Sequence, residues 1–460
     1  MPDTIAALAT PTGRSGIGVI RLSGGESLTI AQKLVANPEF DPKPRFATLA
    51  QLCSPTTGDV IDEAIVTFFQ APHSFTGEDV IEISCHGSPV LLRQVIDICL
   101  NLNARMADAG EFSLRALANG RMNLAEAEAV RDLIDAQTTA SARQAIRQLR
   151  GEFSSQLQPL KDELLNVIVV LESALEFVED DLPELQAESV KTKLSKIVEE
   201  TGKLAATFQA GRLIREGLRV VLVGRPNVGK SSLFNALLGS DRAIVTEIAG
   251  TTRDQIHEQF TIGDIPISLI DTAGLRETTD TVESIGVERS KATMADADIV
   301  IVMLDSSEEI TADDHKILDS VKDLNYIVVL NKIDKVPSFD IDRIIAGEHS
   351  KLGYLRPKIV PISAKTGEAL EDLLDAIVRP FSPQDITTSG FLVTDARHHD
   401  LLTRAKAEIE QSLEQMNSKM SEEIVLIGLH NALRYLGEIT GETTTEDMLT
   451  RIFSTFCIGK

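Results

Sequence analysis

The sequence has few cysteines and no long apolar run. Its 4 cysteines lie far apart along 460 residues, without a Cys-x-x-Cys pair or a cluster of histidines. This spacing argues against a disulfide framework or a zinc site and is typical of a protein kept in a reducing compartment. Apolar runs never reach the length of about 18 residues that a membrane span needs, and the opening residues MPDTIAALATPTGRSG have no basic stretch followed by an apolar one. We therefore expect a cytoplasmic protein that is neither secreted nor inserted in a membrane.

The sequence also lacks an excess of basic residues. Lys and Arg number 45 against 69 Asp and Glu, which gives a formal charge of -24. Because nucleic-acid affinity comes largely from Lys and Arg that neutralise phosphates, this balance argues against a surface that binds RNA throughout. An RNA substrate would have to be held by a local basic patch or by a more basic partner protein.

Composition and hydrophobic patterning indicate a folded chain of several domains. Hydrophobic residues make up 43% of the chain and charged residues 25%, close to the averages of globular proteins. Residues 1–118 alternate short β-type runs with helical runs, which predicts an α/β domain. Residues 119–216 and 382–460 have apolar residues at helical spacing, and residues 217–381 have β-rich runs separated by helix-length segments. The pattern predicts an all-α domain in two parts, with a doubly wound α/β domain inserted between them.

Two helices of the all-α segments carry clear local signals. Apolar residues recur at three- and four-residue steps from Leu157 to Leu175, which predicts a long helix with one apolar face. Near the C-terminus, Thr443 followed three residues later by Glu446 predicts a capping box at the start of the last helix.

A phosphate-binding loop is predicted between a strand and a helix. The residues GRPNVGKS, 224–231, follow an apolar β-type run and precede the helical run SLFNALL. In that context glycines let backbone N–H groups surround phosphates at a helix N-terminus. We expect Lys230 to contact the β- and γ-phosphates and Ser231 to bind Mg²⁺. The residues expected to bind nucleotide here are Asn227, Val228, Gly229, Lys230, Ser231 and Ser232.

Two further segments are predicted to reach the metal and the γ-phosphate. The sequence DTAG, 271–274, ends a second apolar run, as expected of an aspartate near Mg²⁺ and a glycine amide that contacts the γ-phosphate. Thr251 and Thr252 lie between this sequence and the phosphate-binding loop, where a switch loop would bring a hydroxyl to the metal. The nucleotide contacts expected here are Asp271, Thr272, Ala273, Gly274 and Thr252, with Thr252 and Ser231 as Mg²⁺ ligands.

The next strand ends predict a guanine pocket. The sequence NKID, 331–334, closes a third apolar run, and SAK, 363–365, follows the next one. The carboxylate of Asp334 can accept hydrogen bonds from guanine N1–H and its 2-amino group, which adenine cannot supply. The residues expected to form the pocket are Asn331, Lys332, Asp334, Ser363, Ala364 and Lys365. Four motifs in this order at strand ends predict a GTPase domain.

These motifs do not fix the residue that orients the attacking water. Many small GTPases have a glutamine directly after the Asp-x-x-Gly sequence, but Leu275 stands there. The candidates are Glu277, Glu283 and Glu288, which follow in one acidic stretch. A solvated acidic loop is the alternative interpretation for each of them.

The positive charge that stabilises the transition state has two candidate sources. Arg253 or Arg276 could act as an arginine finger from the same chain. Alternatively, Asn227 and the carbonyl-rich segment 246–251 could form an oxygen cage for a monovalent cation between the phosphates. The residues alone leave both sources open.

Four segments together resemble one family. GRPNVGKSS, TEIAGTTRD, DTAGLRE and the C-terminal FCIGK are similar to the MnmE (TrmE) tRNA modification GTPases, over essentially the whole chain. The resemblance implies a Ras-like P-loop GTPase domain whose GTP hydrolysis needs K⁺ and the head-to-head approach of two such domains. It also implies that Glu283 is catalytic together with Asp271, and it speaks against Arg276 as an essential finger. The K⁺ ligands that it implies are Asn227, Thr246, Ile248 and Thr251, of which Thr246 also contacts the nucleotide.

The resemblance implies a folate site as well. The family's N-terminal domain is similar to folate-binding domains, so residues 1–118 would be a folate-binding-like domain. The implied contacts to 5-formyl- or methylene-tetrahydrofolate are Arg21, Glu82, Arg121 and Lys460. The arginines would hold a glutamate-tail carboxylate, and Glu82 would accept hydrogen bonds from the pterin amino group. Cys457 in the tail either presents a thiol near the folate or is an incidental residue of a frayed terminus.

The same resemblance implies a reaction and its partners. It implies a homodimer that forms a heterotetramer with an FAD-containing protein, MnmG (GidA). Together they would place an aminomethyl or carboxymethylaminomethyl group on C5 of the wobble uridine, U34, of certain tRNAs. Given the charge of -24, we expect the partner to hold most of the tRNA. The alternatives are a GTPase switch without modifying activity, such as a ribosome-assembly factor, and a scaffold that binds GTP without hydrolysing it.

Overall fold

A computed structural model of the chain has two compact units. The described residues are 3–176, 184–239, 257–271, 294, 296–336, 358–381, 390–443 and 445–459. One unit comprises residues 1–131, 147–197 and 404–460, and the other comprises residues 132–146 and 198–403. Each unit has hydrophobic cores of its own.

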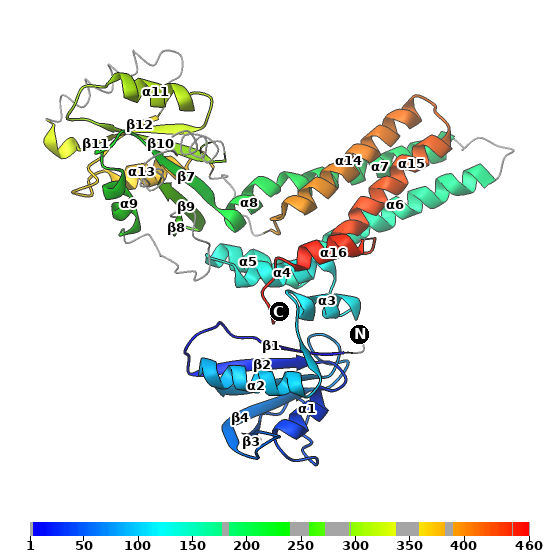
Figure 1. The fold of residues 1–460 in the computed structure, drawn as a ribbon. Coiled ribbons are helices and arrows are strands. Elements are labelled where there is room, and N and C mark those ends of the chain that lie inside the picture. The colour runs from blue at the N-terminus through cyan, green and yellow to red at the C-terminus, as the bar shows by residue number, and fades with distance from the viewer. Residues whose placement is uncertain are drawn as a thin grey trace, which may run out of the picture. The chain divides into compact units, whose positions relative to one another are not determined.

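The N-terminal part of the first unit is a mixed sheet covered by two helices (Figure 1). The strand order is β3-β4-β5-β2-β1-β6. Side chains at alternate strand positions are buried, as Ile20 and Leu22 of β2 are, and they belong to one core with Ile30 of α1 and Val95 of α2. The predicted N-terminal α/β fold is confirmed. Its elements are β1 Thr4–Leu8, β2 Ile17–Ser23, α1 Ser27–Leu34, β3 Thr48–Cys53, β4 Val60–Phe69, β5 Val80–His86, α2 Pro89–Asn101 and β6 Ala104–Met106.

The segments of the sequence that directly precede β7 (Leu218–Val223) and follow α13 (Leu370–Val378) are mostly helical. In the first unit, Leu157, Leu164 and Leu171 of α6 are 0% exposed, so the predicted apolar face is confirmed. Helix α6 packs along α15. The helices are α3 Glu111–Ala118, α4 Leu124–Ile134, α5 Thr139–Leu149, α6 Glu152–Glu176, α7 Glu184–Ala206, α14 Ala396–Asn417, α15 Glu422–Thr440 and α16 Glu446–Phe453.

The start of the last helix differs from the predicted capping box. Helix α16 begins at Glu446, and its N-cap is Thr445, whose side chain makes no cap hydrogen bond. The hydroxyl of Thr443 donates instead to the backbone oxygen of Arg434, at 3.3 Å. The prediction is wrong because Glu446 occupies the first helical position, whereas a capping box needs it at the third.

The second unit contains a largely parallel sheet with helices on both faces (Figure 1). The strand order is β12-β11-β10-β7-β9-β8, and β8 is antiparallel to β9. Leu233 of α9 and Leu373 of α13 lie in the core on one face, and Leu318 and Val321 of α11 lie in the core on the other. The predicted doubly wound fold is therefore confirmed. Its elements are α8 Phe208–Glu216, β7 Leu218–Val223, α9 Lys230–Leu238, β8 His257–Ile262, β9 Ile265–Asp271, β10 Ile299–Asp305, α11 Ala312–Val321, β11 Tyr326–Asn331, the 3₁₀ helix η2 Ile333–Lys335, β12 Lys358–Pro361 and α13 Leu370–Val378.

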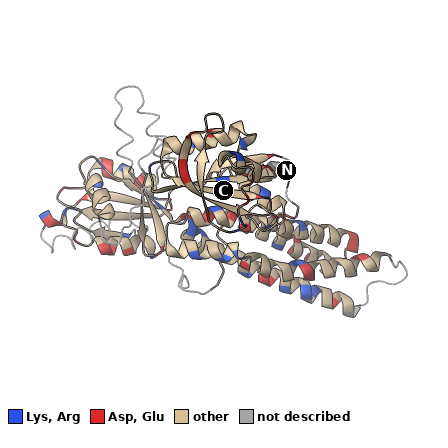
Figure 2. Cartoon of the chain, turned by 90° about the horizontal axis from the view of Figure 1, so that it is seen from below, with Lys and Arg blue, Asp and Glu red and all other residues tan. Residues whose placement is uncertain are grey.

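Charged residues of both signs are interspersed over the chain. Figure 2 shows Lys and Arg alternating with Asp and Glu along the long helices. Several of these charges form ion pairs one helical turn apart, such as Lys203 with Glu199 at 2.8 Å. Within the described ranges, no helix combines the length and the apolar character that crossing a bilayer requires.

Candidate nucleotide-binding site

The predicted nucleotide motifs lie at the carboxyl ends of parallel strands. The phosphate-binding loop follows β7, Asp271 ends β9, Asn331 ends β11 and Ser363 follows β12. Parallel pairing of β9, β7, β10, β11 and β12 puts these ends on one edge of the sheet. The sheet extends to β9 on one side of β7 and to β10 on the other, and such a switch point forms a crevice that binds ligands.

Two glycines of the phosphate-binding loop occupy positions that a side chain would obstruct. Gly224 has a φ of 155°, and a Cβ there would lie 2.7 Å from the backbone oxygen of Met303. Gly229, the N-cap of α9, has a φ of 101°, and its Cβ would lie 2.2 Å from Nδ2 of Asn331. The loop therefore approaches its neighbours as backbone alone, which is the arrangement that lets amides surround a phosphate at a helix N-terminus.

The carbonyl groups of this loop accept hydrogen bonds from the side chains of Lys230, Asn331 and Lys332. Nζ of Lys230 donates to the backbone oxygens of Gly224 at 2.8 Å and Arg225 at 2.7 Å. Nζ of Lys332 donates to Asn227 O, and Nδ2 of Asn331 donates to Val228 O, both at 2.8 Å. Because the carbonyls are engaged in this way, the amides of the loop remain for an anionic ligand.

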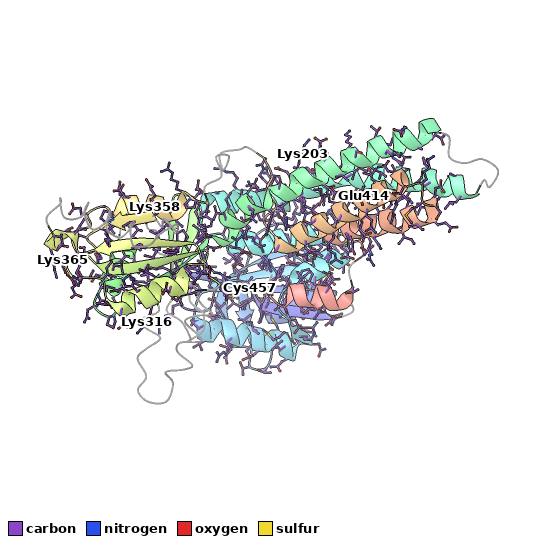
Figure 3. The ribbon with its side chains drawn as sticks, turned by 90° about the horizontal axis from the view of Figure 1, so that it is seen from above. Lys203, Lys316, Lys358, Lys365, Glu414 and Cys457 are labelled. Atoms are coloured by element: carbon purple, nitrogen blue, oxygen red, sulfur yellow. The ribbon has the colours of Figure 1, made fainter. Side chains whose placement is uncertain are left out.

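The base-recognition motifs are bonded to each other as well as to the loop. Oδ1 of Asn331 accepts a hydrogen bond from the amide of Ala364 at 2.9 Å, and Asn331 is only 2% exposed. The hydroxyl of Ser363 donates to Oδ1 of Asp334 at 2.7 Å, which orients the carboxylate expected to select guanine. Lys365 is exposed on the loop after β12 (Figure 3). Asn331 thus connects the phosphate-binding loop with the segment 363–365.

Asp305, at the end of β10, contacts one of these motifs, a contact that was not predicted from the sequence. Its side chain is 3% exposed, and Oδ2 accepts a hydrogen bond from Nζ of Lys332. Oδ1 accepts from the amide of Ser307 at 3.0 Å and from its hydroxyl at 2.6 Å. Burial raises the pKa of Asp305, but the hydrogen bonds from Lys332 and Ser307 lower it by more, so its pKa lies below the ordinary value. The signal was present, since the apolar run DIVIVMLD ends on this aspartate.

Arg225 anchors the start of the phosphate-binding loop and was also missed. Its Nε donates to Oδ1 of Asp314 at 2.7 Å, and Asp314 is 1% exposed. Asp314 belongs to a capping box with Thr311 at the start of α11. This ion pair fastens the loop to a helix on the opposite face from α9.

Several predicted site residues lie outside the described part of the chain. Asp271 is described as the last residue of β9, without its side chain. The residues outside are Thr246, Ile248, Thr251, Thr252, Arg253, Thr272, Ala273, Gly274, Arg276, Glu277, Glu283, Glu288 and Lys460. Among the expected Mg²⁺ and K⁺ ligands, Ser231 and Asn227 are described, and both are exposed.

In the first unit, Arg21 and Glu82 face each other on neighbouring strands. They are direct partners in the register of β2 and β5, and Oε1 of Glu82 accepts from Nε of Arg21 at 2.9 Å and from Nη2 at 2.6 Å. The guanidinium also lies 5.8 Å from the ring centre of Phe75 and 5.7 Å from that of Phe112. Arg21 is therefore fixed by charge and by aromatic contact.

The C-terminal tail reaches this arginine. Nη1 of Arg21 donates to the backbone oxygen of Gly459 at 3.3 Å, and Ile458 forms an antiparallel bridge with Ala109. Cys457 is exposed (Figure 3). Arg121 is exposed as well, beside the loop that contains Gly77, where a Cβ would lie 3.2 Å from Cγ of Arg121. The structure brings Arg21, Glu82 and the tail together and places Arg121 on a neighbouring loop.

Comparisons with known proteins match the whole chain. The model of the GTP-binding protein TrmE N-terminus matches residues 4–121, and the model of the MnmE helical domain matches residues 124–457. The tRNA modification GTPase MnmE of Koribacter versatilis is 44% identical to this chain, and the match covers 100% of both chains. The proteins of the same name from Aquifex aeolicus and Alkaliphilus metalliredigens are 43% and 41% identical, again over 100% of both chains. The chain therefore belongs to the MnmE family of tRNA modification GTPases.

Proposed function

We propose that this GTPase acts in the modification of C5 of the wobble uridine, U34, of certain tRNAs, and that its GTP hydrolysis depends on K⁺. The added group would be aminomethyl or carboxymethylaminomethyl. One observation carries the proposal, the 44% identity with the Koribacter versatilis protein over the full length of both chains. A ribosome-assembly GTPase, the alternative, would share the nucleotide domain but has no reason to share the segments on either side of it.

The residues of the second sheet suit a guanine nucleotide with Mg²⁺. The close approaches at Gly224 and Gly229 leave a cradle of backbone amides for the phosphates, and Lys230 adds a cation at the start of α9. The hydroxyl of Ser231 is exposed in the first turn of α9, and with that of Thr252 it offers the oxygen ligands that Mg²⁺ prefers. Asp334, oriented by Ser363, supplies the acceptor for the guanine edge.

We propose that the potassium dependence comes from an oxygen cage beside the phosphates. Asn227 is exposed in a left-handed backbone conformation, with a φ of 67°, and its carbonyl is held by Lys332. Its side-chain oxygen, with oxygens of Thr246, Ile248 and Thr251, provides neutral ligands for a monovalent cation, which supplies positive charge next to the transferred phosphate. In this proposal two nucleotide domains of a homodimer approach each other with GTP bound, and Glu283 orients the attacking water.

The N-terminal site supports a folate as the one-carbon donor. Glu82 can accept hydrogen bonds from a pterin amino group, Arg21 is paired with Glu82 and therefore lies at the same end of the ligand, and Arg121 can bind a carboxylate of the glutamate tail. Arg21 also contacts Gly459, next to Lys460, so the tail borders the same site. We propose that 5-formyl- or methylene-tetrahydrofolate binds here, and that an FAD-containing partner, MnmG (GidA), completes a heterotetramer. With a charge of -24 on this chain, the partner holds most of the tRNA.

The folate site offers a test that separates the proposal from the ribosome-assembly alternative. In a calorimetric titration the purified protein should bind 5-formyl-tetrahydrofolate, and R21A should lose most of the heat. R93A, which removes an exposed arginine on α2 in the same domain, is the matched control and should bind as the wild type does. Absence of heat in the wild type would favour the alternative. Nucleoside analysis of tRNA from cells that lack the gene then reports whether the U34 modification is lost.

A further inference from the structure

Asp305 is a buried carboxylate at the end of β10 that contacts Lys332 of the sequence NKID. We propose that Asp305 is a positioning residue for GTP binding, which holds the ammonium group of Lys332 against the phosphate-binding loop and thereby fixes Asn227. The inference rests on the proposed function in one respect, namely that this loop binds GTP. It adds a residue from β10, a strand to which no nucleotide motif was assigned.

The geometry gives the two oxygens of Asp305 separate tasks. Oδ1 accepts both hydrogen bonds from Ser307 and so closes the turn after β10. Oδ2 faces Nζ of Lys332. The register supports this division, because Asp305 is the direct partner of Asn331, the residue before Lys332, in the pairing of β10 with β11. A carboxylate at the end of β10 therefore lies where the base-recognition loop begins.

Lys332 needs such a partner to act on the loop. Its ammonium group ends a flexible four-carbon side chain, and holding it in one place costs side-chain entropy. The hydrogen bond to Oδ2 of Asp305 fixes the group, and the hydrogen bond to Asn227 O then transmits that position to the loop. The ion pair also neutralises the ammonium charge within the protein. Lys332 therefore connects Asp305, at the end of β10, with Asn227 in the loop after β7.

Asn227, the last residue in this series of contacts, has an uncommon backbone conformation. Asn227 has a φ of 67°, in the left-handed region, which few non-glycine residues adopt and which asparagine adopts more readily than most. Its backbone oxygen accepts a hydrogen bond from Nζ of Lys332, 105 residues away in the sequence, at 2.8 Å. Loss of Asp305 would release Lys332, and Asn227 would then sample other conformations in which the loop amides no longer converge on a phosphate.

A purely structural role would instead reside in the turn at Ser307, and two substitutions separate the roles. D305N keeps an Oδ1 that can accept from Ser307 but puts a donor where Lys332 needs an acceptor. S307A removes the hydroxyl bond to Oδ1 and leaves Oδ2 unchanged. D305E restores a carboxylate on a longer side chain and tests for partial rescue. D313N, which removes an exposed carboxylate on α11, is the control for loss of one negative charge from the same domain.

The experiment measures GTP affinity for the full-length protein and its variants, with the melting temperature of each as a check on folding. We expect D305N and K332A each to weaken GTP binding by about tenfold to a hundredfold, as loss of a charge-assisted hydrogen bond does. The double variant D305N/K332A should bind no more weakly than the weaker single variant, because both act through one contact. D305E should recover part of the affinity, and S307A and D313N should stay within about twofold of the wild type.

Two results would overturn the inference. The first is D305N binding GTP within about twofold of the wild type while K332A does not, and the second is a double variant whose loss equals the product of the two single losses. A wild-type protein that binds no GTP would contradict the proposed function itself. That outcome is distinct, because it appears before any variant is compared.

Discussion

Replacing Gly229 by alanine perturbs the tightest contact of the phosphate-binding loop. The φ of Gly229 is 101°, and a Cβ there would lie 2.2 Å from Nδ2 of Asn331. Asn331 has little room to move, since it is 2% exposed and is bonded to both Val228 O and the amide of Ala364. The new methyl group must therefore either distort the loop or displace a side chain that joins two motifs.

The expected cost of G229A has two parts. A left-handed backbone costs an alanine roughly 1–2 kcal/mol. Displacing Asn331 gives up two hydrogen bonds of about 0.5–1.5 kcal/mol each. The sum of about 2–5 kcal/mol corresponds to a loss of affinity of roughly 30-fold to a few thousandfold, at about 1.4 kcal/mol per factor of ten. We expect the loss in nucleotide affinity, because the loop can relieve the strain only by abandoning the amide arrangement that the phosphates need.

The assay is a calorimetric titration of wild type and G229A with GDP, and the chain offers a matched control. Gly263 also has a positive φ, 59°, but a Cβ there would meet nothing within 4 Å. It lies in the turn between β8 and β9, away from the strand ends that form the crevice. G263A should lose about 1–2 kcal/mol of stability and keep its affinity. G229A binding GDP within about threefold of the wild type would refute the reasoning.

Further predictions concern the base, the chemistry and the pH dependence. D334N replaces a hydrogen-bond acceptor by a donor, so the affinity for GTP should fall. Xanthosine triphosphate, which has an oxygen in place of the 2-amino group, should then bind better than GTP. An unchanged preference for GTP in competition binding would contradict this. E283A should keep GTP affinity but lose most turnover in a phosphate-release assay, and an unchanged kcat would remove Glu283 from the mechanism. Burial raises the pKa of Asp395, but His398 and Arg215 together lower it by more than burial raises it, so the pKa lies below the ordinary value. Because the pKa of Asp395 is lower in the folded state, its ionisation stabilises the fold fully at pH values above the unfolded pKa of about 3.9. That stabilisation is lost as the pH falls from the unfolded pKa through the folded pKa. D395N should therefore be less stable than the wild type at pH 7 by about 1.5–3 kcal/mol, because it removes one of the two carboxylates that pair with Arg215 and leaves Asp132 as the other. The difference should shrink as the pH falls from 5 to 3 in denaturant unfolding.

Features that depend on residues close together in the sequence could be predicted from the sequence alone. The glycines at 224 and 229, the lysine at 230 and the NKID sequence are short strings next to apolar runs, so both the strand ends and the crevice could be predicted from them. Helix α6 was equally clear, because its apolar face repeats over 25 residues. The doubly wound sheet followed from the order of these runs.

Contacts between distant residues could not be predicted in the same way. Asp305 contacts Lys332, which is 27 positions later in the sequence, and Arg225 contacts Asp314, which is 89 positions later. The apolar run before Asp305 places it at a strand end, but local spacing does not show which residue it pairs with, and nothing near Arg225 in the sequence indicates Asp314. The last helix illustrates a different limit, because threonines at both 443 and 445 can serve as an N-cap and only the packing of the chain end decides between them.

Hydrolysis of GTP and ATP by the full-length protein tests the central claim most directly. The claim is that amides around Gly229 and Lys230 bind the triphosphate and that Asp334 selects guanine. Measured side by side in KCl and MgCl₂, kcat/KM for GTP should exceed that for ATP by roughly 10⁴-fold, as expected of a site built to pair with hydrogen-bond donors that the competitor lacks. Comparable values for the two nucleotides, or hydrolysis of neither, would contradict the account.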